Sequence, residues 1–511
     1  MRRPLLLVLV MVSACAHPKP APPAPDLHSA RLAAADRELR AGCLDCLVAA
    51  YREYDALRTV PAAAERASTG AIRAAALIAL RERELGMVDE GYVQRGRDVA
   101  AGYPAVPPVL ATVLDVVDAT APASVGAGRP TNDADLERMR VVRTNREAWS
   151  DALRAAAGSD VAVAYAWLAF TCGSSDARAM SRDDIIRPVE SSATTPLIRY
   201  RTATCRAVES DTLQRLLADE PRFQEIEYTR GLAFVARQKL DDADAAFDRA
   251  WQWHPAWPTL TLAIANVAMT AEEFERAMTM YAETLKYEPQ AVDALLGKVK
   301  ALTYLSRNTE AIATTDELLL QRWYVGDARY WRAVNETALE RYDDAWTDIE
   351  LAAKLLVNAE VPKLAGIIAY HRHELEVSRG KFDDSLKRNP SDCETFYYLG
   401  LVLGELRQWP RASDVVPKAG ACLERTVEQA REAIEAIRAS DDPPARKARK
   451  IAKREQTIAV SLRWIATCWF NSAVASYNLA RPAEARQWAE RVVDDEQFGA
   501  RARELLAQLA K

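Results

Sequence analysis

The chain has 511 residues, of which 49% are hydrophobic and 27% are charged, and its formal net charge is −5 at pH 7. This hydrophobic content supports a large core and excludes wholesale disorder, and the net charge gives no whole-chain attraction to nucleic acid. Alanine is abundant, glycine is sparse and the residue alternation typical of strands is almost absent, so we expect helix throughout. The length allows several compact domains or one long solenoid.

The N-terminal residues have the pattern of a secretory signal. Two arginines precede an apolar run at 5–12, which ends in Val-Ser-Ala before Cys15. The run is too short to span a bilayer. Its end resembles the bacterial lipobox, in which small residues precede a cysteine that is lipidated and becomes the first residue. We therefore expect a signal peptide at 1–14 and lipidation at Cys15; the alternative is an ordinary signal peptide with a chance cysteine.

A proline-rich tether follows the lipidation site, at 15–30. The segment 16–25 favours extended polyproline conformation, which at about 3 Å per residue would hold the folded body roughly 30 Å from the membrane. Ala16 is not the aspartate that often retains lipoproteins at the inner membrane, so we expect an outer-membrane anchor facing the periplasm. We expect no second apolar stretch of membrane length in the chain.

The region 31–220 reads as helices with degenerate repeats. Gly86 to Gly91, and Gly42 to Cys46, have the composition of turns between two helices.

A fixed period of 34 residues begins near Gln224. Four alanines recur at this spacing, namely Ala243, Ala277, Ala311 and Ala345. Pro255 and Pro289 are one period apart, as are Phe247 and Tyr281.

This pattern resembles the tetratricopeptide repeat, a pair of antiparallel helices of that length. The small residue lets the helices pack closely, and the aromatic residue four positions later fills the space on the same face. The proline ends the pair because it cannot continue a helix. The resemblance implies an all-α, tetratricopeptide-type helical-hairpin solenoid.

The register divides the array, 221–425, into consecutive units. They are Gln224–Trp257, Pro258–Ala291, Val292–Val325, Gly326 to about Asn358, Ala359–Asp392 and Cys393 onward, with a slip of one residue after the fourth. In 426–511 we expect two long helices separated at Pro443-Pro444 and then a hairpin and a helix that cap the solenoid.

Seven cysteines remain after Cys15, and export would favour their pairing. Cys393 and Cys422 lie at the two ends of one repeat, which antiparallel helices bring together. Cys172 and Cys205 are about one period apart, and pairing is possible because Cys172 lies at the edge of a turn-rich stretch. Cys43 and Cys46 could form a local clip, a redox site or a metal site, of which the clip is favoured. Cys468 is expected to be a buried free thiol.

The sequence lacks the common catalytic signatures, and we expect no enzyme, cofactor or metal site. His371 and His373 are two positions apart, so on a helix they point to different faces and cannot chelate together. Phosphate-binding glycine loops, nucleophile elbows and dinucleotide fingerprints do not occur. The basic run 446–454 could contact headgroups or an acidic partner. We favour instead a solvated helix face balanced by the Glu-rich helix before it.

The resemblance also implies a groove for protein partners on the first helices of the repeats. Transfer of the family's groove positions gives Tyr228, Asn266, Met269, Lys300, Tyr304, Tyr330, Tyr370, His371, Tyr397 and Leu401. Tyrosine suits protein recognition because it is amphipathic and loses little entropy on binding. The alternative is that some of these tyrosines are core residues between repeats, and we expect about half to be exposed.

Acidic residues recur at the second position of the units, where the helix dipole accounts for them without a ligand. They are Glu225, Asp293, Asp327, Glu360 and Glu394. The Lys and Asn set by which some family members hold a C-terminal carboxylate is not reproduced. The leading hypothesis is a lipid-anchored envelope scaffold that binds other envelope proteins or peptides, and no nucleic acid. The alternative is a periplasmic solute- or glycan-binding lipoprotein.

Overall fold

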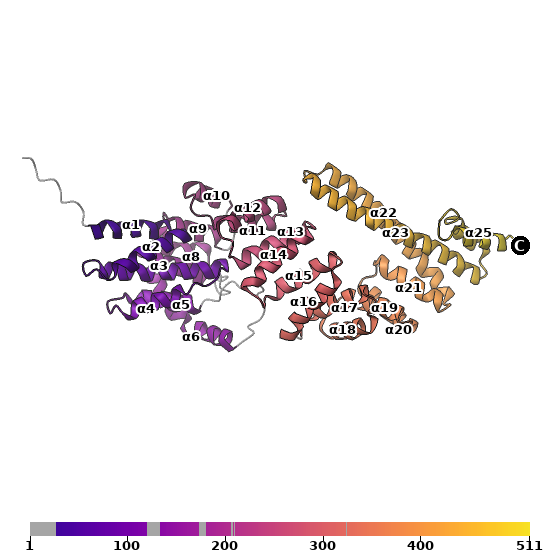
Figure 1. Ribbon diagram of the computed structural model, residues 1–511, viewed down its shortest axis with the longest axis horizontal. Helices are drawn as coiled ribbons and strands as arrows, with labels where there is room; N and C mark the ends of the chain where they lie inside the picture. Colours follow the sequence, from indigo (N-terminus) through magenta and orange to yellow (C-terminus); the bar gives the residue numbers. More distant parts are fainter. Residues whose placement is uncertain are drawn as a thin grey trace, which may run out of the picture. The chain divides into compact units, whose positions relative to one another are not determined.

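The computed structural model describes residues 27–119, 133–172, 180–205, 208, 210–322 and 324–510. Cys15 and most of its tether lie outside these ranges. Every regular element within them is a helix, which confirms the all-α prediction (Figure 1). The contacts divide the chain into two compact units, one of residues 1–80, 91–118 and 145–205 and the other of 81–90, 119–144 and 206–511.

The regular elements of the N-terminal unit are helices of very different length, from five residues in α8 to 24 in α6. Its residues belong to α1 (Leu27–Ala41), α2 (Leu44–Leu57), α3 (Ala64–Leu85), α4 (Tyr92–Ala101), α5 (Pro108–Ala119), α6 (Asp133–Ala156), α7 (Val161–Cys172), α8 (Arg182–Ile186), the 3₁₀ helix η2 (Arg187–Ser192) and α9 (Pro196–Thr204), with α3, α5 and α6 crossing the boundary between units. The expected turns near Gly42 and between Gly86 and Gly91 do separate helices, α1 from α2 and α3 from α4.

Tyr54 is the centre of the packing between α2 and α3. Its side chain is fully buried, and its hydroxyl donates a hydrogen bond of 2.5 Å to the Asp36 carboxylate. A Cβ on Gly70 would lie 2.5 Å from the tyrosine ring. Glycine at that position is therefore what allows the two helices to approach each other around the ring.

Two disulfides lie in the N-terminal unit. One joins Cys43 to Cys46 at the start of α2, and the other joins Cys172 at the end of α7 to Cys205 just after α9. Their Cα atoms are 4.9 and 5.2 Å apart, within the usual range for a disulfide.

The second unit contains the repeat array, in which helices alternate as first and second members of a pair. After α10 (Ser210–Asp219) the pairs are α11 (Ile226–Ala236) with α12 (Leu240–Trp253), α13 (Pro258–Thr270) with α14 (Phe274–Tyr287), α15 (Val292–Tyr304) with α16 (Asn308–Gln321), α17 (Gly326–Ala338) with α18 (Tyr342–Leu355), α19 (Glu360–His371) with α20 (Leu375–Arg388), and α21 (Cys393–Glu405) with the start of α22 (Trp409–Ala439). These bounds match the units read from the sequence.

The turn inside each pair has the same geometry. Its left-handed residues, with φ between 55° and 61°, are Gln238, Glu272, Ser306, Glu340, His373, Arg407 and Ala480. In each case the amide of the next residue donates to the carbonyl five positions earlier at 2.8 to 2.9 Å, which is a Schellman motif. The spacing is 34 residues up to Glu340, 33 to His373 and 34 to Arg407. This sequence of spacings confirms the predicted slip of one residue.

The last two left-handed residues, Arg407 and Ala480, are 73 residues apart, which exceeds the period by 39. With the same register the final unit begins at Ala466, so the extra residues are 427–465. They are the end of α22 and most of α23 (Pro444–Asn478), which form a long antiparallel hairpin (Figure 1). We call residues 427–465 the insertion. The array then resumes with the end of α23 and α24 (Pro482–Glu490), followed by α25 (Gly499–Gln508).

Helix α23 has an apolar window of 18 residues with mean hydropathy 1.2, so by length and composition alone it could cross a membrane. The expectation that no second apolar stretch reaches membrane length is therefore wrong. Some of the apolar side chains of this helix belong to the core of the terminal units. Ile465, Trp469 and Ala473 are buried in one cluster with Leu423 of α22.

Candidate functional site

The first helices of the repeats define the candidate binding surface. Each first helix contacts the first helix of the next unit, from α11 through α21 to α23, in addition to its own partner. A solenoid curves toward the helices that approach one another, so the first helices line its inner face. All ten residues predicted for the groove lie on these helices.

The ten residues differ in exposure. Asn266, Tyr304 and His371 are exposed, and the other seven are half-buried. Tyr228 is a packing residue, because its ring centroid lies 4.8 Å from that of Trp257 and 6.0 Å from that of Phe247. Tyr330, Met269 and Leu401 are also half-buried.

Two of the tyrosines are held by specific neighbours. The Tyr370 hydroxyl donates to Glu405 at 2.7 Å, and burial together with this hydrogen bond raises the pKa of Tyr370. Tyr397 stacks on Trp464 of the insertion, with centroids 4.6 Å apart. These contacts fix both rings in place.

The centre of the inner face is an aromatic cluster around Tyr304, which is 52% exposed. Tyr304 stacks on Phe274 at 4.7 Å and meets the edge of Trp331 at 6.2 Å. The ammonium group of Lys300 lies 5.8 Å from the Trp331 ring centroid. This cluster combines exposed aromatic area with a neighbouring charge, the composition that interface anchors favour.

Sequence reasoning missed three aromatic residues that open second helices on this side of the array. Phe274, Tyr342 and Trp409 are the first residues of α14, α18 and α22. Tyr342 stacks on the His371 ring, with centroids 4.9 Å apart and planes 3° apart. The signal that could have found them is their shared position, because each comes two residues after a left-handed turn residue.

The tip of the insertion contacts the turns of the first two repeats. Arg446 pairs with Asp241, and Glu273 lies 3.6 Å from Arg446 and 2.6 Å from Arg449. The Lys453 ammonium pairs with Glu272 at 2.7 Å.

These contacts correct the prediction for the basic run 446–454. Its partners come mainly from the turns of the array, about 180 residues earlier in the chain, and not from the Glu-rich helix before it. Arg446 is also not solvated, since its side chain is only 10% exposed. The sequence could not show this, because the pairing depends on the length and direction of the hairpin.

No family model matches the chain, and no curated protein is similar to it. Among solved structures it is similar to a tetratricopeptide repeat protein from Parabacteroides merdae (14% identity, 56% of this chain and 99% of that chain, TM-score 0.35). It is similar also to YrrB, a TPR protein with an unusual peptide-binding site (14%, 36% and 96%, 0.33), and to PilF of Pseudomonas aeruginosa (16%, 40% and 90%, 0.34). The period of 34 residues and the pairing of antiparallel helices define the fold of the chain. The fold is a tetratricopeptide-type solenoid.

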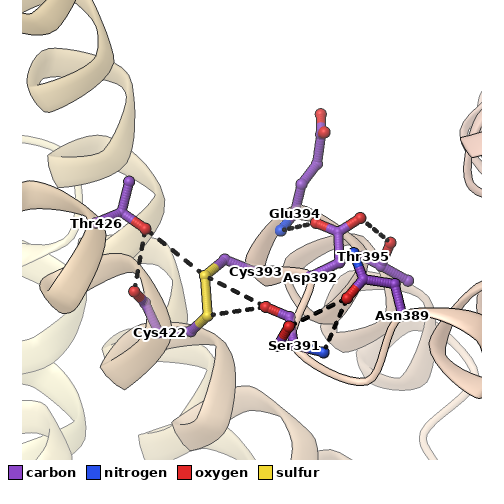
Figure 2. The surroundings of a disulfide bond; sticks show 8 residues. All are labelled: Asn389, Ser391, Asp392, Cys393, Glu394, Thr395, Cys422 and Thr426. Atoms are coloured by element: carbon purple, nitrogen blue, oxygen red, sulfur yellow. Dashed lines mark hydrogen bonds between the residues drawn. A yellow bond between two sulfur atoms is a disulfide. The ribbon is translucent and has the colours of Figure 1, made fainter. Parts of the chain in front are cut away.

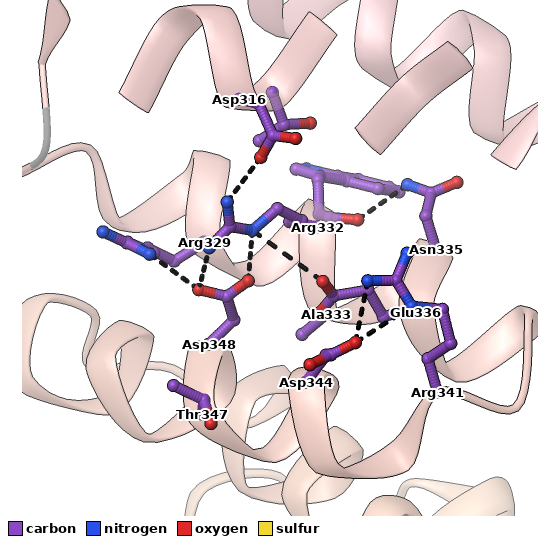
Figure 3. Close-up of polar contacts among 12 residues, drawn as sticks. Asp316, Arg329, Arg332, Ala333, Asn335, Glu336, Arg341, Asp344, Thr347 and Asp348 are labelled. Atoms are coloured by element: carbon purple, nitrogen blue, oxygen red, sulfur yellow. Dashed lines mark hydrogen bonds and ion pairs between the residues drawn. The ribbon is translucent and has the colours of Figure 1, made fainter. Parts of the chain in front are cut away.

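A polar network joins three consecutive helices of the tetratricopeptide array (Figure 3). The Arg332 guanidinium donates to Asp348 at 2.7 Å and to Asp316 at 2.5 Å, and Arg329 donates to Asp348 at 2.8 Å. Asp348 is 1% exposed and lies on α18, whereas Asp316 lies on α16 and the arginines on α17. The network therefore ties one repeat to the next.

Glu336 is the titratable group at the edge of this network. It is only 4% exposed. Burial, and then the neighbouring Asp348 carboxylate, raises the pKa of Glu336 to about 7, against the opposing effect of Arg332 and Arg341. The carboxyl group therefore changes charge near neutral pH.

A third disulfide, between Cys393 and Cys422, joins the start of α21 to α22 (Figure 2). It links the two ends of one repeat, as the sequence suggested. The Asp392 carboxylate caps α21, accepting from the Glu394 amide at 3.1 Å and the Thr395 hydroxyl at 2.9 Å. Cys468 is a buried free cysteine, as predicted, and burial raises the pKa of its thiol to about 12.

Glu225 differs from the other acidic residues at the second unit position. It is fully buried and lies 3.2 Å from the equally buried Arg81 guanidinium of α3. The helix dipole alone is therefore not a sufficient account of this glutamate. A buried carboxylate requires a paired charge, and Arg81, which supplies it, lies 144 residues earlier in the chain.

Proposed function

We propose that the chain is a scaffold of the bacterial cell envelope, held to a membrane by lipidated Cys15, which binds protein partners on the inner face of its tetratricopeptide array. The observation that carries the proposal is the aromatic cluster of Tyr304, Phe274 and Trp331 on that face, together with the half-exposed Tyr304 ring. Aromatic side chains that lie together with one ring exposed and a cation beside them have the composition that anchors of protein interfaces favour.

The N-terminal pattern supports the anchor. The basic residues, the short apolar run and the small residues before Cys15 are those of an exported lipoprotein. The three disulfides, with Cα separations between 4.9 and 5.4 Å, fit an oxidising compartment. We place the anchor in the outer membrane, facing the periplasm.

Binding of a solute or glycan has less support. A crevice between α18, α19 and α20, lined by Ile349, Val361 and Lys381 among others, encloses about 120 Å³. Pockets for small molecules are usually larger, about 300 Å³ or more. This crevice is therefore too small for a glycan chain.

Site-specific photocrosslinking in cells tests the binding surface. A photoreactive phenylalanine analogue replaces Tyr304 on the inner face, and a matched variant carries it at the exposed Thr347 of α18. We expect discrete protein adducts from position 304 and few from position 347. Equal adduct patterns at the two positions, or none at position 304, would refute the inner face as the binding surface.

Membrane fractionation tests the anchor separately. Cys15→Ala removes the proposed acylation site, and the chain should then leave the membrane fraction. Unchanged retention of this variant in the membrane would contradict lipidation at Cys15.

A further inference from the structure

The insertion contacts the first two repeats in the way that a bound helical peptide would, through charged side chains on one helix face. Arg446, Arg449 and Lys453 are spaced by three and four residues, so they lie on one face of α23. That face meets Asp241, Glu272 and Glu273, which lie at the turns α11–α12 and α13–α14. Three cations thus meet three carboxylates across two parts of the chain that are far apart in sequence.

Aromatic rings add a second mode of recognition. The Lys453 ammonium lies 5.7 Å from the centroid of Phe274 and 5.7 Å from that of Tyr304. A cation over the faces of two aromatic rings is attracted by both. We call Asp241, Glu272, Glu273, Phe274 and Tyr304 together the acidic–aromatic site.

Two of the three cations in this contact are exposed to solvent, whereas the Arg446 side chain is only 10% exposed. The side chains of Arg449 and Lys453 are 45% and 41% exposed, so salt screens these pairs and each is weak. The insertion belongs to the same chain as the turns that it contacts, and it is continuous with the packed helices α22 and α23, so the contact forms without any loss of free translation. A partner that presents the same chemistry with better packing can replace it.

We propose that the acidic–aromatic site is a docking site for a basic helical segment of a partner, and that the insertion occupies this site as a ligand supplied by the chain itself. The partner segment carries Lys or Arg at positions i, i+3 and i+7, because it must replace Arg446, Arg449 and Lys453. The inference rests on the proposed function, since the site includes Tyr304 at the centre of the inner face. It adds the chemistry of the partner segment. It also adds a closed state, in which the insertion occupies the acidic–aromatic site before a partner binds.

The closed state is measured first, on the full chain without a partner. A carbodiimide activates the Glu272 carboxylate, and the Lys453 amine then forms an amide with it, while the oxygen leaves in the urea by-product. Mass spectrometry of the digested chain should detect this link, because the two groups are 2.7 Å apart. The link should fall severalfold at 1 M salt, where the Debye length is about 3 Å. Lys453→Arg is the matched control, since it keeps the charge and forms no such amide.

Competition is measured second, with a synthetic peptide of residues 444–463 as the probe. The open variant carries Arg446→Gln, Arg449→Gln and Lys453→Gln. It should bind the peptide at least about tenfold more tightly than the unmodified chain does, because in the unmodified chain the peptide must first displace the insertion. A peptide with glutamate at the three basic positions is the control ligand. Glu272→Gln with Glu273→Gln in the open variant should remove the binding.

The proposal is wrong if the carbodiimide link is absent at low salt, or if the peptide binds the open variant and the unmodified chain equally. It is also wrong if the glutamine substitutions at 272 and 273 leave peptide binding unchanged. Circular dichroism checks the fold of the open variant, and Lys453→Gln alone, at an exposed position, replaces it if the helix content falls. These readouts involve no cellular partner, so they separate failure of this inference from failure of the scaffold proposal, which the photocrosslinking tests.

Discussion

The tetratricopeptide array and the N-terminal unit build their turns differently. In the N-terminal unit the left-handed turn residues are glycines, Gly42 and Gly91. In the array they are seven residues that carry side chains, from Gln238 to Ala480, although a left-handed conformation costs such residues about 1–2 kcal/mol each. The same Schellman hydrogen bond closes every one of these turns. The difference teaches that repeated helix packing can impose a turn that the local sequence does not favour.

The largest expected effect comes from removing a buried aromatic residue from each region. Phe382→Ala in the array and Tyr54→Ala in the N-terminal unit should each cost about 3–5 kcal/mol, through lost burial and the cavity left behind; both side chains are fully buried. Hydrogen exchange should show the largest loss of protection in the repeats next to Phe382, because each repeat packs mainly on its neighbours; the first two repeats are also contacted by the insertion. Increased exchange in α16, two repeats away from Phe382, would show that the array unfolds as one cooperative body.

Removal of the disulfides should have the next largest effect on the free energy of unfolding. This effect should be similar in the array and in the N-terminal unit. The Cys172–Cys205 and Cys393–Cys422 links span 33 and 29 residues, so paired Cys→Ala variants should lose about 2–4 kcal/mol in each case. The Cys43–Cys46 link spans three residues and should contribute least. Denaturant unfolding with and without reductant measures this order. An equal loss from all three would contradict the dependence on loop length.

Glu336 should give the array a pH dependence of stability that the N-terminal unit does not share. Its folded pKa of about 7 lies above the ordinary value of 4.5, so the folded state holds the proton more strongly than the unfolded chain does. The contribution of Glu336 is therefore fully present below about pH 4.5 and is lost as the pH rises through about 7. Glu336→Gln should remove this slope and stabilise the chain at pH 8 by on the order of 1–3 kcal/mol.

Thermal unfolding at pH 5 and pH 8 checks this expectation. Glu350→Gln is a suitable control, because Glu350 is an exposed carboxylate on α18 in the same region of the array. A destabilising effect of Glu336→Gln at pH 8 would mean that the ionised carboxylate is the stabilising form.

The smallest effects should come from exchanging the turn residues themselves. Ser306→Gly removes the strain of a side-chain-bearing residue in the left-handed backbone conformation. It should change the free energy of unfolding by less than about 1 kcal/mol, because glycine also gains entropy in the unfolded chain. Gly91→Ala in the N-terminal unit has open space around the added Cβ and should cost about 1–2 kcal/mol from strain alone. Denaturant midpoints measure both. A larger loss from Ser306→Gly would mean that the serine side chain stabilises the turn.

Much of the array could be predicted from the sequence. The alanines and aromatic residues at a fixed period gave the helix pairs, their bounds and the slip of one residue, because each repeat is a local structure that its own residues specify. The disulfide between Cys393 and Cys422 followed from the same antiparallel geometry. The ten groove positions also fell on the first helices, although only Asn266, Tyr304 and His371 are exposed.

The candidate site was less predictable. Three aromatic residues of the inner face lie outside the family's usual groove positions. Phe274 and Trp331 contact Tyr304, and Trp464 stacks on Tyr397. Glu225 looked like an ordinary acid of a first helical turn, yet it is buried with Arg81. The apolar window of α23 contradicts the expectation from the sequence, and the burial of its side chains depends on contacts with α22 and α24.

The sequence by itself determined the helix pairs, their period and the N-terminal pattern around Cys15, because these depend on residues close together in the chain. Only the tertiary structure decided where the insertion lies. Its basic residues form ion pairs with carboxylates about 180 positions earlier, and the length and direction of a hairpin set that contact. A charge in a sequence has no partner until the fold brings one within a few ångströms.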